Sequence, residues 1–212
     1  YKVYLGGRAI SGPGQGAQIA PPYDAEIAER IAAVGALAAV PMPGSGWQSL
    51  GAEMVEEYTE RAATSARMRA VAPLRIVLTA LHGVGGPVCR DALSRVGLDV
   101  VVVPEQLEAD PDFPTVDLPN PEEPGTLDMS LALAREVDAD LVIANDPDAD
   151  RCCAAIPDEH ATGGWRRLTG DEVGAVLGEQ AAELAAFTGT GILANSIVSS
   201  RMLRKIAQAH GL

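Results

Sequence analysis

Residues 141–151 read Leu-Val-Ile-Ala-Asn-Asp-Pro-Asp-Ala-Asp-Arg, an apolar stretch followed at once by a loop that carries three carboxylates. The apolar half, residues 141–144, is short and rich in branched side chains, which predicts a buried β-strand. Parallel α/β folds place their ligand sites at the carboxyl ends of such strands. The acidic loop, defined as residues 145–151, is therefore the first candidate for a functional site.

Two similar apolar stretches lie earlier in the chain, at 74–79 and 100–103. Helical patterns separate the three stretches, one over 87–97 and one that begins at 126 or 128. The order strand, helix, strand, helix, strand predicts a parallel sheet with crossover helices. The expected fold class is therefore α/β.

Both flanks of these elements carry further patterns. Before them, we expect a strand at 1–5, a helix at 24–34 capped by Asp24, and a connecting helix at 48–70. After them, we expect a hairpin of 152–156 with 165–168, a helix at 172–186 capped by Asp171, a strand at 191–194, and a helix from Ser199 or Ser200 to His210. A Pro/Gly-rich stretch at 41–46 indicates a boundary. The chain is therefore predicted to divide into residues 1–45, 46–70, 71–151 and 152–212.

Composition narrows the classes of function. The 212 residues are 47% apolar and 21% charged, which suits a packed core, and the formal net charge is −13. Nucleic-acid and anionic-membrane binding normally need a basic face, so neither partner is expected. No apolar run in the sequence has the length of a membrane span. The three cysteines, Cys89, Cys152 and Cys153, fit neither a disulfide framework nor a metal-binding spacing, so a reducing, cytoplasmic setting is expected.

The acidic loop has the chemistry of a metal site. Asp146, Asp148 and Asp150 alternate along it, and in a curved loop their carboxylates can converge on one cation. Ligands that are all oxygen favour Mg²⁺ over zinc or copper. The guanidinium of Arg151 would then stand beside the metal, which suits a phosphate group. A solvated acidic turn is the alternative, but three neighbouring carboxylates without a counter-ion repel one another.

Two other kinds of loop begin with alternating aspartates. An EF-hand also needs Gly at its sixth and Glu at its twelfth position, where this chain has Arg151 and Pro157, so an EF-hand is excluded. A haloacid-dehalogenase-type phosphatase would use Asp146 as its nucleophile and Asp148 as its acid, with Lys205 as the candidate for its lysine. A phosphatase therefore stays open as an alternative, as does a metal- or sugar-phosphate-binding module without turnover.

Together with three other stretches, the acidic loop resembles the phosphohexomutase superfamily, the phosphoglucomutases and phosphomannomutases. The metal loop of that family usually reads Asp-Gly-Asp-x-Asp-Arg, and here Pro147 stands in place of the glycine. The stretches at 81–86 (Leu-His-Gly-Val-Gly-Gly), 119–125 (Pro-Asn-Pro-Glu-Glu-Pro-Gly) and 1–4 (Tyr-Lys-Val-Tyr) are also similar to segments of the family. The first two fit best the longer subgroup that resembles phosphoglucomutase and phosphopentomutase.

The resemblance implies consecutive mixed or parallel α/β domains of the phosphohexomutase type and a mutase activity. The four predicted parts would be the end of domain one, a connecting helix, domain two with the metal loop, and the start of domain three. The enzyme would be an isomerase that moves a phosphoryl group between C1 and C6 of a sugar phosphate through a phosphoserine. The family's Thr-Ala-Ser-His-Asn-Pro nucleophile loop, its sugar-reading loop and its fourth domain have no match in these 212 residues. The resemblance therefore implies a central fragment, with incomplete first and third domains, that is inactive by itself.

The resemblance also implies roles for individual residues. Asp146, Asp148 and Asp150 would hold Mg²⁺, which acts as a Lewis acid on the phosphoryl oxygens. Arg151 would be a catalytic residue that holds the phosphoserine or the phosphoryl group in transfer.

Three more residues are weaker candidates for binding the sugar phosphate. His82 lies in a glycine-rich turn and could face the site, although such a histidine more often bonds its own turn. Ser199 and Arg201 begin the last expected helix, where capping the helix is the alternative role. The glycines beside His82 could offer N–H groups to an anion, or could serve only the tight turn. No feature of the sequence assigns an oligomeric state.

Overall fold

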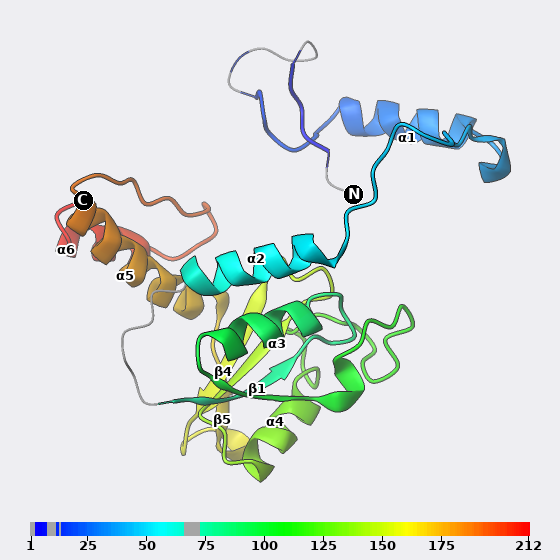
Figure 1. The fold of residues 1–212 in the computed structure, drawn as a ribbon. Helices are drawn as coiled ribbons and strands as arrows, with labels where there is room; N and C mark the ends of the chain where they lie inside the picture. The colour runs from blue at the N-terminus through cyan, green and yellow to red at the C-terminus, as the bar shows by residue number, and fades with distance from the viewer. Residues whose placement is uncertain (1–2, 8–11, 13, 66–72) are drawn as a thin grey trace. The chain divides into compact units, whose positions relative to one another are not determined.

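A computed structural model describes residues 3–7, 12, 14–65 and 73–212 of the chain (Figure 1). The chain splits into two compact units, Tyr1–Ser49 and Leu50–Leu212. The sequence suggested a boundary after residue 45. The first unit holds α1 (Tyr23–Ala33) and the short 3₁₀ helix η1 (Leu37–Ala39). The second unit holds the helices α2 (Ala52–Ser65), α3 (Gly86–Arg95), α4 (Asp128–Glu136), α5 (Gly170–Thr188) and α6 (Met202–Ala209), the strands β1 (Arg75–Thr79), β2 (Asp99–Val102), β3 (Leu141–Asn145), β4 (Cys152–Pro157) and β5 (Trp165–Arg167), and the 3₁₀ helices η2 (Pro104–Gln106) and η3 (Thr162–Gly164).

A five-stranded sheet forms the centre of the second unit, in the order β2-β1-β3-β4-β5. The first three strands are parallel, and Val77 in the middle of β1 pairs with Val101 on one side and with Val142 on the other. β4 runs antiparallel to β3, with Cys153 opposite Ala144, and β5 is antiparallel to β4. The expected α/β class is confirmed, and the sheet is mixed, with three parallel strands followed by two antiparallel ones.

The sheet extends beyond the boundary that the sequence suggested at residue 151. β4 begins directly after the acidic loop and pairs with β3, and β5 then pairs with β4. Residues 152–167 therefore complete the sheet of residues 75–145 and do not begin a second one. β4 joins this sheet because the short acidic loop lets it fold back antiparallel along the free edge of β3. The hairpin expected from 152–156 and 165–168 is confirmed.

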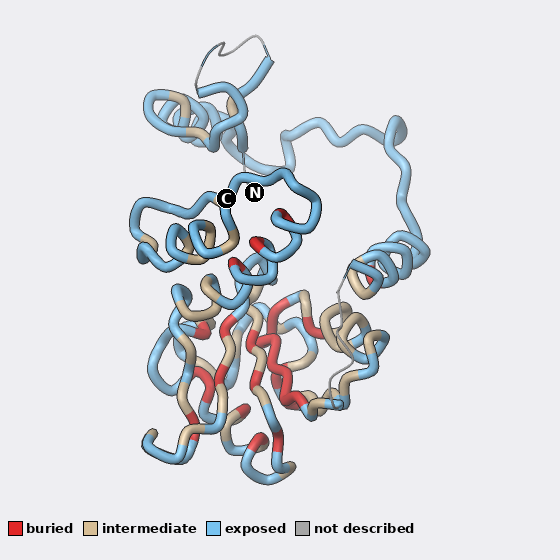
Figure 2. Tube along the Cα trace, turned by 90° about the vertical axis from the view of Figure 1, so that its left-hand side faces the viewer, coloured by how far each residue is buried: buried red, intermediate tan, exposed pale blue. Residues whose placement is uncertain are grey.

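Helices cover both faces of the sheet (Figure 1). α3 packs on β1 and β2, and α4 packs on β1 and β3. The chain steps from β1 to β2 in one direction and then back past β1 to β3, so two right-handed crossovers place these helices on opposite faces. On the α4 side, Val77, Val142 and Ala155 are fully buried from three adjacent strands. Figure 2 shows the buried residues gathered along the strands.

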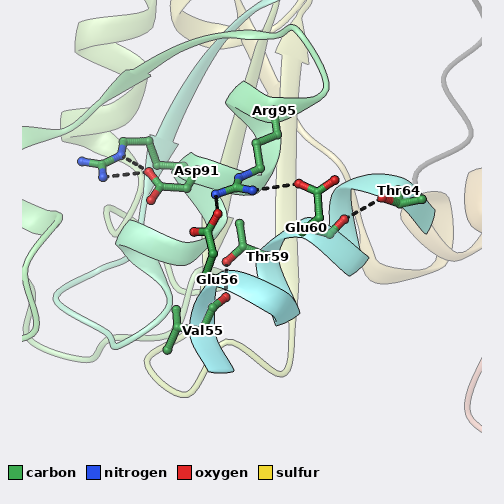
Figure 3. A network of polar contacts seen from close by, with 8 residues as sticks. Val55, Glu56, Thr59, Glu60, Thr64, Asp91 and Arg95 are labelled. Atoms are coloured by element: carbon green, nitrogen blue, oxygen red, sulfur yellow. Dashed lines mark hydrogen bonds and ion pairs between the residues drawn. The ribbon is translucent and has the colours of Figure 1, made fainter. Parts of the chain in front are cut away.

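The connecting helix α2 docks on α3 through a small polar network (Figure 3). Arg95 of α3 forms ion pairs with Glu56 at 2.6 Å and with Glu60 at 2.8 Å, two residues one turn apart on α2. Thr59 lies on the same side of α2 and is only 3% exposed. α2 begins at Ala52 and not at the expected residue 48, and residues 66–70 of the expected helix lie outside the described part of the chain.

Several element ends differ from the sequence expectations. Residues 191–194 form no strand, because no described strand lies beside them to complete a hydrogen-bonded ladder. α6 begins at Met202 and not at 199 or 200. α5 takes Thr169 as its N-cap in place of Asp171, since Glu172 three residues later completes a capping box with Thr169.

The first unit has few regular contacts among its described residues. The expected strand at 1–5 appears as one isolated bridge between Tyr4 and Gln18, and residues 1–2 lie outside the described part. α1 follows Pro22 without a side-chain cap, so Asp24 falls inside the helix and does not cap it. Across both units, no helix among the described residues has the length and apolar character to cross a membrane.

Candidate metal centre

Two loops meet where the strand order of the sheet reverses. The glycine turn, residues 80–86, follows β1, and the acidic loop follows β3, the parallel neighbour of β1. Both loops therefore leave the sheet at the carboxyl ends of adjacent strands. Open α/β sheets bind their ligands at this kind of place.

The acidic loop brings its three carboxylates together. Asp146, Asp148 and Asp150 each offer an oxygen, and these atoms all lie within 4.8 Å of one another. Asp146 is 2% exposed, whereas Asp148 and Asp150 are exposed. A cluster of oxygen donors, one of them buried, fits a hard divalent cation such as Mg²⁺.

A closed backbone turn causes this convergence. The Asp146 N–H donates to the Arg151 carbonyl at 3.3 Å, and the Ala149 N–H donates to the Asp146 carbonyl at 2.9 Å. Ala149 lies in the left-handed region with φ 55°, which lets the chain reverse within a few residues. Three alternating carboxylates that an extended strand would spread apart are thereby placed around one point.

Arg151 binds the buried carboxylate from two sides. Its backbone N–H donates to Asp146 Oδ1 at 3.0 Å, and its Nε donates to Asp146 Oδ2 at 2.8 Å. Its Nε also lies 3.7 Å from Asp150 Oδ1. The Arg151 side chain is 56% exposed, so the guanidinium stands at the mouth of the cluster, where an anion can approach it.

The glycine turn packs directly against the acidic loop. A Cβ on Gly83 would lie 2.5 Å from Pro147 Cα, and a Cβ on Gly85 would lie 2.5 Å from the Cβ of Ala149. The Val84 N–H donates to the Pro147 carbonyl at 2.9 Å. The close approach of the two loops therefore explains these glycines, and it leaves the Val84 N–H engaged by protein.

One buried atom beside the cluster lacks a partner. Among the described residues, Asn145 Oδ1 is the buried side-chain atom for which no hydrogen bond is formed. Asn145 ends β3, is paired across the hairpin with Cys152 and is the first residue of the acidic loop. Buried polar atoms are normally hydrogen-bonded, and such exceptions concentrate at functional sites. The atom supports the interpretation of this edge as a ligand site.

Comparison with known proteins identifies the family of the chain. Residues 56–160 match the family model for phosphoglucomutase/phosphomannomutase, alpha/beta/alpha domain II. A probable phosphomannomutase of Haemophilus influenzae is 41% identical over 99% of this chain and 42% of its own length. The chain belongs to the phosphoglucomutase/phosphomannomutase superfamily.

A second relative and a solved structure belong to the same superfamily. A phosphoribomutase of Saccharomyces cerevisiae is 35% identical over 75% of this chain and 28% of its own length. The crystal structure of a phosphoglucomutase/phosphomannomutase family protein from Burkholderia thailandensis shares the fold, with a TM-score of 0.65 and 19% identity over 93% of this chain and 39% of that one. This chain therefore spans less than half the length of these superfamily members.

In this superfamily member, His82 is a buried residue of the loop packing. It is 4% exposed, and its Nε2 lies 2.8 Å from the Thr115 hydroxyl. Gln106 donates to the same hydroxyl at 2.8 Å and accepts a hydrogen bond from the Thr79 hydroxyl at 2.6 Å. The network ties the end of β1 to the long loop before α4. His82 is therefore placed in the turn beside the acidic loop but not among its carboxylates, and Gln106 had no sequence signal because its partners lie far along the chain.

Ser199 and Arg201 lie on the connection between α5 and α6. The Ser199 hydroxyl hydrogen-bonds the Ser196 hydroxyl at 2.8 Å, and Arg201 occupies the N-cap position of α6. The Asp171 carboxylate accepts the N–H of Ser200 at 2.9 Å beside a cavity of about 390 Å³. These contacts are local to the helical segment, so the structure does not bring the two candidates together with the carboxylate cluster.

Thiols near the site are held in their neutral form. Burial raises the pKa of the Cys89 thiol, and the Cys152 thiol adds to this effect. Burial also raises the pKa of the Cys153 thiol on β4. A nucleophilic thiolate is therefore not favoured at either position.

Proposed function

We propose that this chain carries the Mg²⁺-binding part of a phosphosugar mutase, an isomerase that moves a phosphoryl group between C1 and C6 of a sugar phosphate. The observation that carries the proposal is the convergence of three carboxylates with an exposed guanidinium at the carboxyl ends of two adjacent parallel strands. The mutase names of its relatives support the same class of reaction. The phosphoserine of the reaction would lie outside these residues, and the reaction would take place in the cytoplasm.

In this proposal, each part of the chain has a place in the mutase. Residues 1–45 would end the first domain, 46–70 would connect, and the sheet with its acidic loop would form the second domain. The segment after β5 would begin the third domain, where Ser199 and Arg201 would contact the sugar phosphate. His82 would serve the site from its buried position, by holding the glycine turn against the acidic loop.

The residues of the cluster would divide the chemistry among them. Asp146, Asp148 and Asp150 would hold Mg²⁺, which supplies charge neutralisation to a phosphoryl group in transfer. Arg151 would orient that group through its N–H donors, which match phosphate oxygens in a planar fork. The glycine turn would keep the acidic loop in its closed form and so fix the spacing of the carboxylates.

Metal binding is tested first, by calorimetric titration of Mg²⁺ into the 212-residue chain. Asp148→Ala should abolish the binding heat, because it removes one of three converging ligands. Asp91→Ala is the matched control, since it removes one exposed carboxylate of α3 that pairs with Arg90 at 2.7 Å. Unchanged Mg²⁺ affinity in Asp148→Ala would refute the assignment of the site.

Activity is tested on the full reading frame that encodes these residues. Glucose 1-phosphate and mannose 1-phosphate, whose C6 hydroxyl can receive the phosphoryl group, are supplied with Mg²⁺, and both isomerisation and free phosphate are followed in the same tube. Isomerisation without phosphate release supports the mutase. Phosphate release without isomerisation would favour a phosphatase with Asp146 as nucleophile, and Mg²⁺ binding without either product would favour a binding module.

A further inference from the structure

We infer that Arg151 is a built-in competitor for the metal, which holds Asp146 until a divalent cation displaces it and which is then free to bind a phosphate. The inference rests on the proposed function, because it concerns the same carboxylate cluster. It adds a coupling between two ligands that the cluster alone does not imply.

The first observation is that Arg151 engages both oxygens of the buried ligand. Its backbone N–H takes Asp146 Oδ1 and its Nε takes Asp146 Oδ2, at 3.0 Å and 2.8 Å. The backbone contact closes the loop and does not depend on the side chain. The side-chain contact places a full positive charge on the one carboxylate that is removed from solvent.

A second reason for competition is the 2.8 Å contact between Arg151 Nε and Asp146 Oδ2. A Mg²⁺ ion bonded to Asp146 Oδ2 at its usual distance of about 2.1 Å would lie within about 5 Å of the Arg151 Nε as it now stands. Two cations at that separation repel each other, and the repulsion is stronger near a buried group than in bulk water. The metal and the guanidinium therefore compete for the same carboxylate.

The third observation concerns the charge of Asp146. A carboxylate that is 2% exposed needs a cationic partner or a set of hydrogen bonds, because an unpaired buried charge is strongly destabilising. Arg151 supplies that partner, and a divalent cation can replace it. Asp146 thus keeps a cationic partner through the exchange, and the charge of that partner rises from one to two.

Once displaced from Asp146, the Arg151 side chain can extend into solvent. Arg151 is 56% exposed, so its guanidinium can turn toward solvent without crossing packed atoms. An exposed guanidinium beside a divalent cation is a strong site for a phosphate. By linkage, a phosphate that binds the released Arg151 must in turn tighten the binding of the metal by the same factor.

The test compares Mg²⁺ affinity in the wild-type chain, Arg151→Gln and Arg90→Gln, with and without inorganic phosphate. Arg90 is the matched control, since its Nε also bonds an aspartate at 2.8 Å but on the exposed surface of α3. Arg151→Gln should bind Mg²⁺ on the order of tenfold more tightly than the wild type, and phosphate should no longer tighten it. Arg90→Gln should match the wild type in both respects.

A second readout separates displacement from simple charge removal. The Nε–H resonance of Arg151, assigned by its loss in Arg151→Gln, should shift and exchange faster with water as Mg²⁺ is added. A resonance that stays unchanged while the amides of the acidic loop shift would overturn the inference and leave the metal site standing. Equal Mg²⁺ affinity in wild type and Arg151→Gln would overturn it as well. Absence of Mg²⁺ binding in all three chains would reject the proposed metal site itself, and the inference with it.

Discussion

Apolar side chains are buried in the sheet but largely exposed in the C-terminal helical segment, residues 170–212. In the sheet, Val77 and Val142 are fully buried. In the helical segment, Phe187 is 87% exposed and Ile197 is fully exposed. Val77 and Val142 are therefore held by neighbours from distant parts of the sequence, whereas Phe187 and Ile197 are left largely in contact with solvent. The same type of residue should respond differently to substitution in the two regions.

Replacing a glycine by alanine should show the largest difference in stability between the sheet and the helical segment. Gly83→Ala puts a Cβ 2.5 Å from the backbone of Pro147, so the glycine turn or the acidic loop must move. We expect a loss of about 2–3 kcal/mol in the free energy of unfolding, measured by urea denaturation, and weaker Mg²⁺ binding because the carboxylates lose their spacing.

Gly174 in α5 is the matched glycine of the other region. A Cβ there would meet no atom within 4 Å, so Gly174→Ala should stabilise the helix by about 0.5–1 kcal/mol. Equal and small effects at Gly83 and Gly174 would show that the glycine turn does not support the acidic loop.

The sequence predicted the elements whose signals are local. The apolar stretch at 141–144 and the alternating acids after it were enough to place a strand and a candidate site at its end. The glycine turn was visible as a pattern, but its role depends on Pro147 and Ala149, which lie more than sixty positions away. No local pattern contains that contact.

Pairing between strands explains the remaining differences. Whether residues 152–156 open a new sheet or extend the previous one depends on which edge they meet, and that edge belongs to β3. Residues 191–194 have the composition of a strand but no described strand beside them, so the strand predicted there from composition alone was wrong. Gln106 was missed for a different reason, since its side chain bonds Thr79 and Thr115, and no local pattern contains these contacts.

Replacing a glutamine by leucine should show an intermediate difference in stability between the two regions. Gln106 is fully buried, and Gln106→Leu would leave the hydroxyls of Thr79 and Thr115 without their amide partner. We expect a loss of about 2 kcal/mol in the free energy of unfolding, because a buried polar group without a partner is costly. Gln180→Leu on the exposed face of α5 should change that free energy by no more than about 0.5 kcal/mol. Similar losses at both positions would contradict the buried network around His82.

The smallest expected effect lies at the junction of the two regions, where Thr169 caps α5. The Thr169 hydroxyl accepts the Glu172 N–H at 3.2 Å, and its backbone N–H donates to the Glu172 carboxylate at 2.8 Å. Thr169→Ala should lower the free energy of unfolding by about 1 kcal/mol, the usual loss for an N-cap hydroxyl. Thr188→Ala at the other end of α5 is the control, because its hydroxyl bonds only carbonyls of its own helix and of Thr190.

The same capping box should make the stability of α5 depend on pH. The backbone N–H of Thr169, followed by Arg166 and the Thr169 hydroxyl, lowers the pKa of Glu172 below its ordinary value. A carboxyl group whose pKa is lowered by folding stabilises the folded state above its unfolded pKa and loses that contribution as the pH falls through the folded pKa. The wild type should therefore lose stability below about pH 4, whereas Glu172→Gln, which can still accept the Thr169 N–H, should lose less over the same range. Parallel pH profiles for the two chains, followed by the helical circular dichroism signal, would mean that α5 is held by packing, and the contrast between the two regions would then fail at their junction.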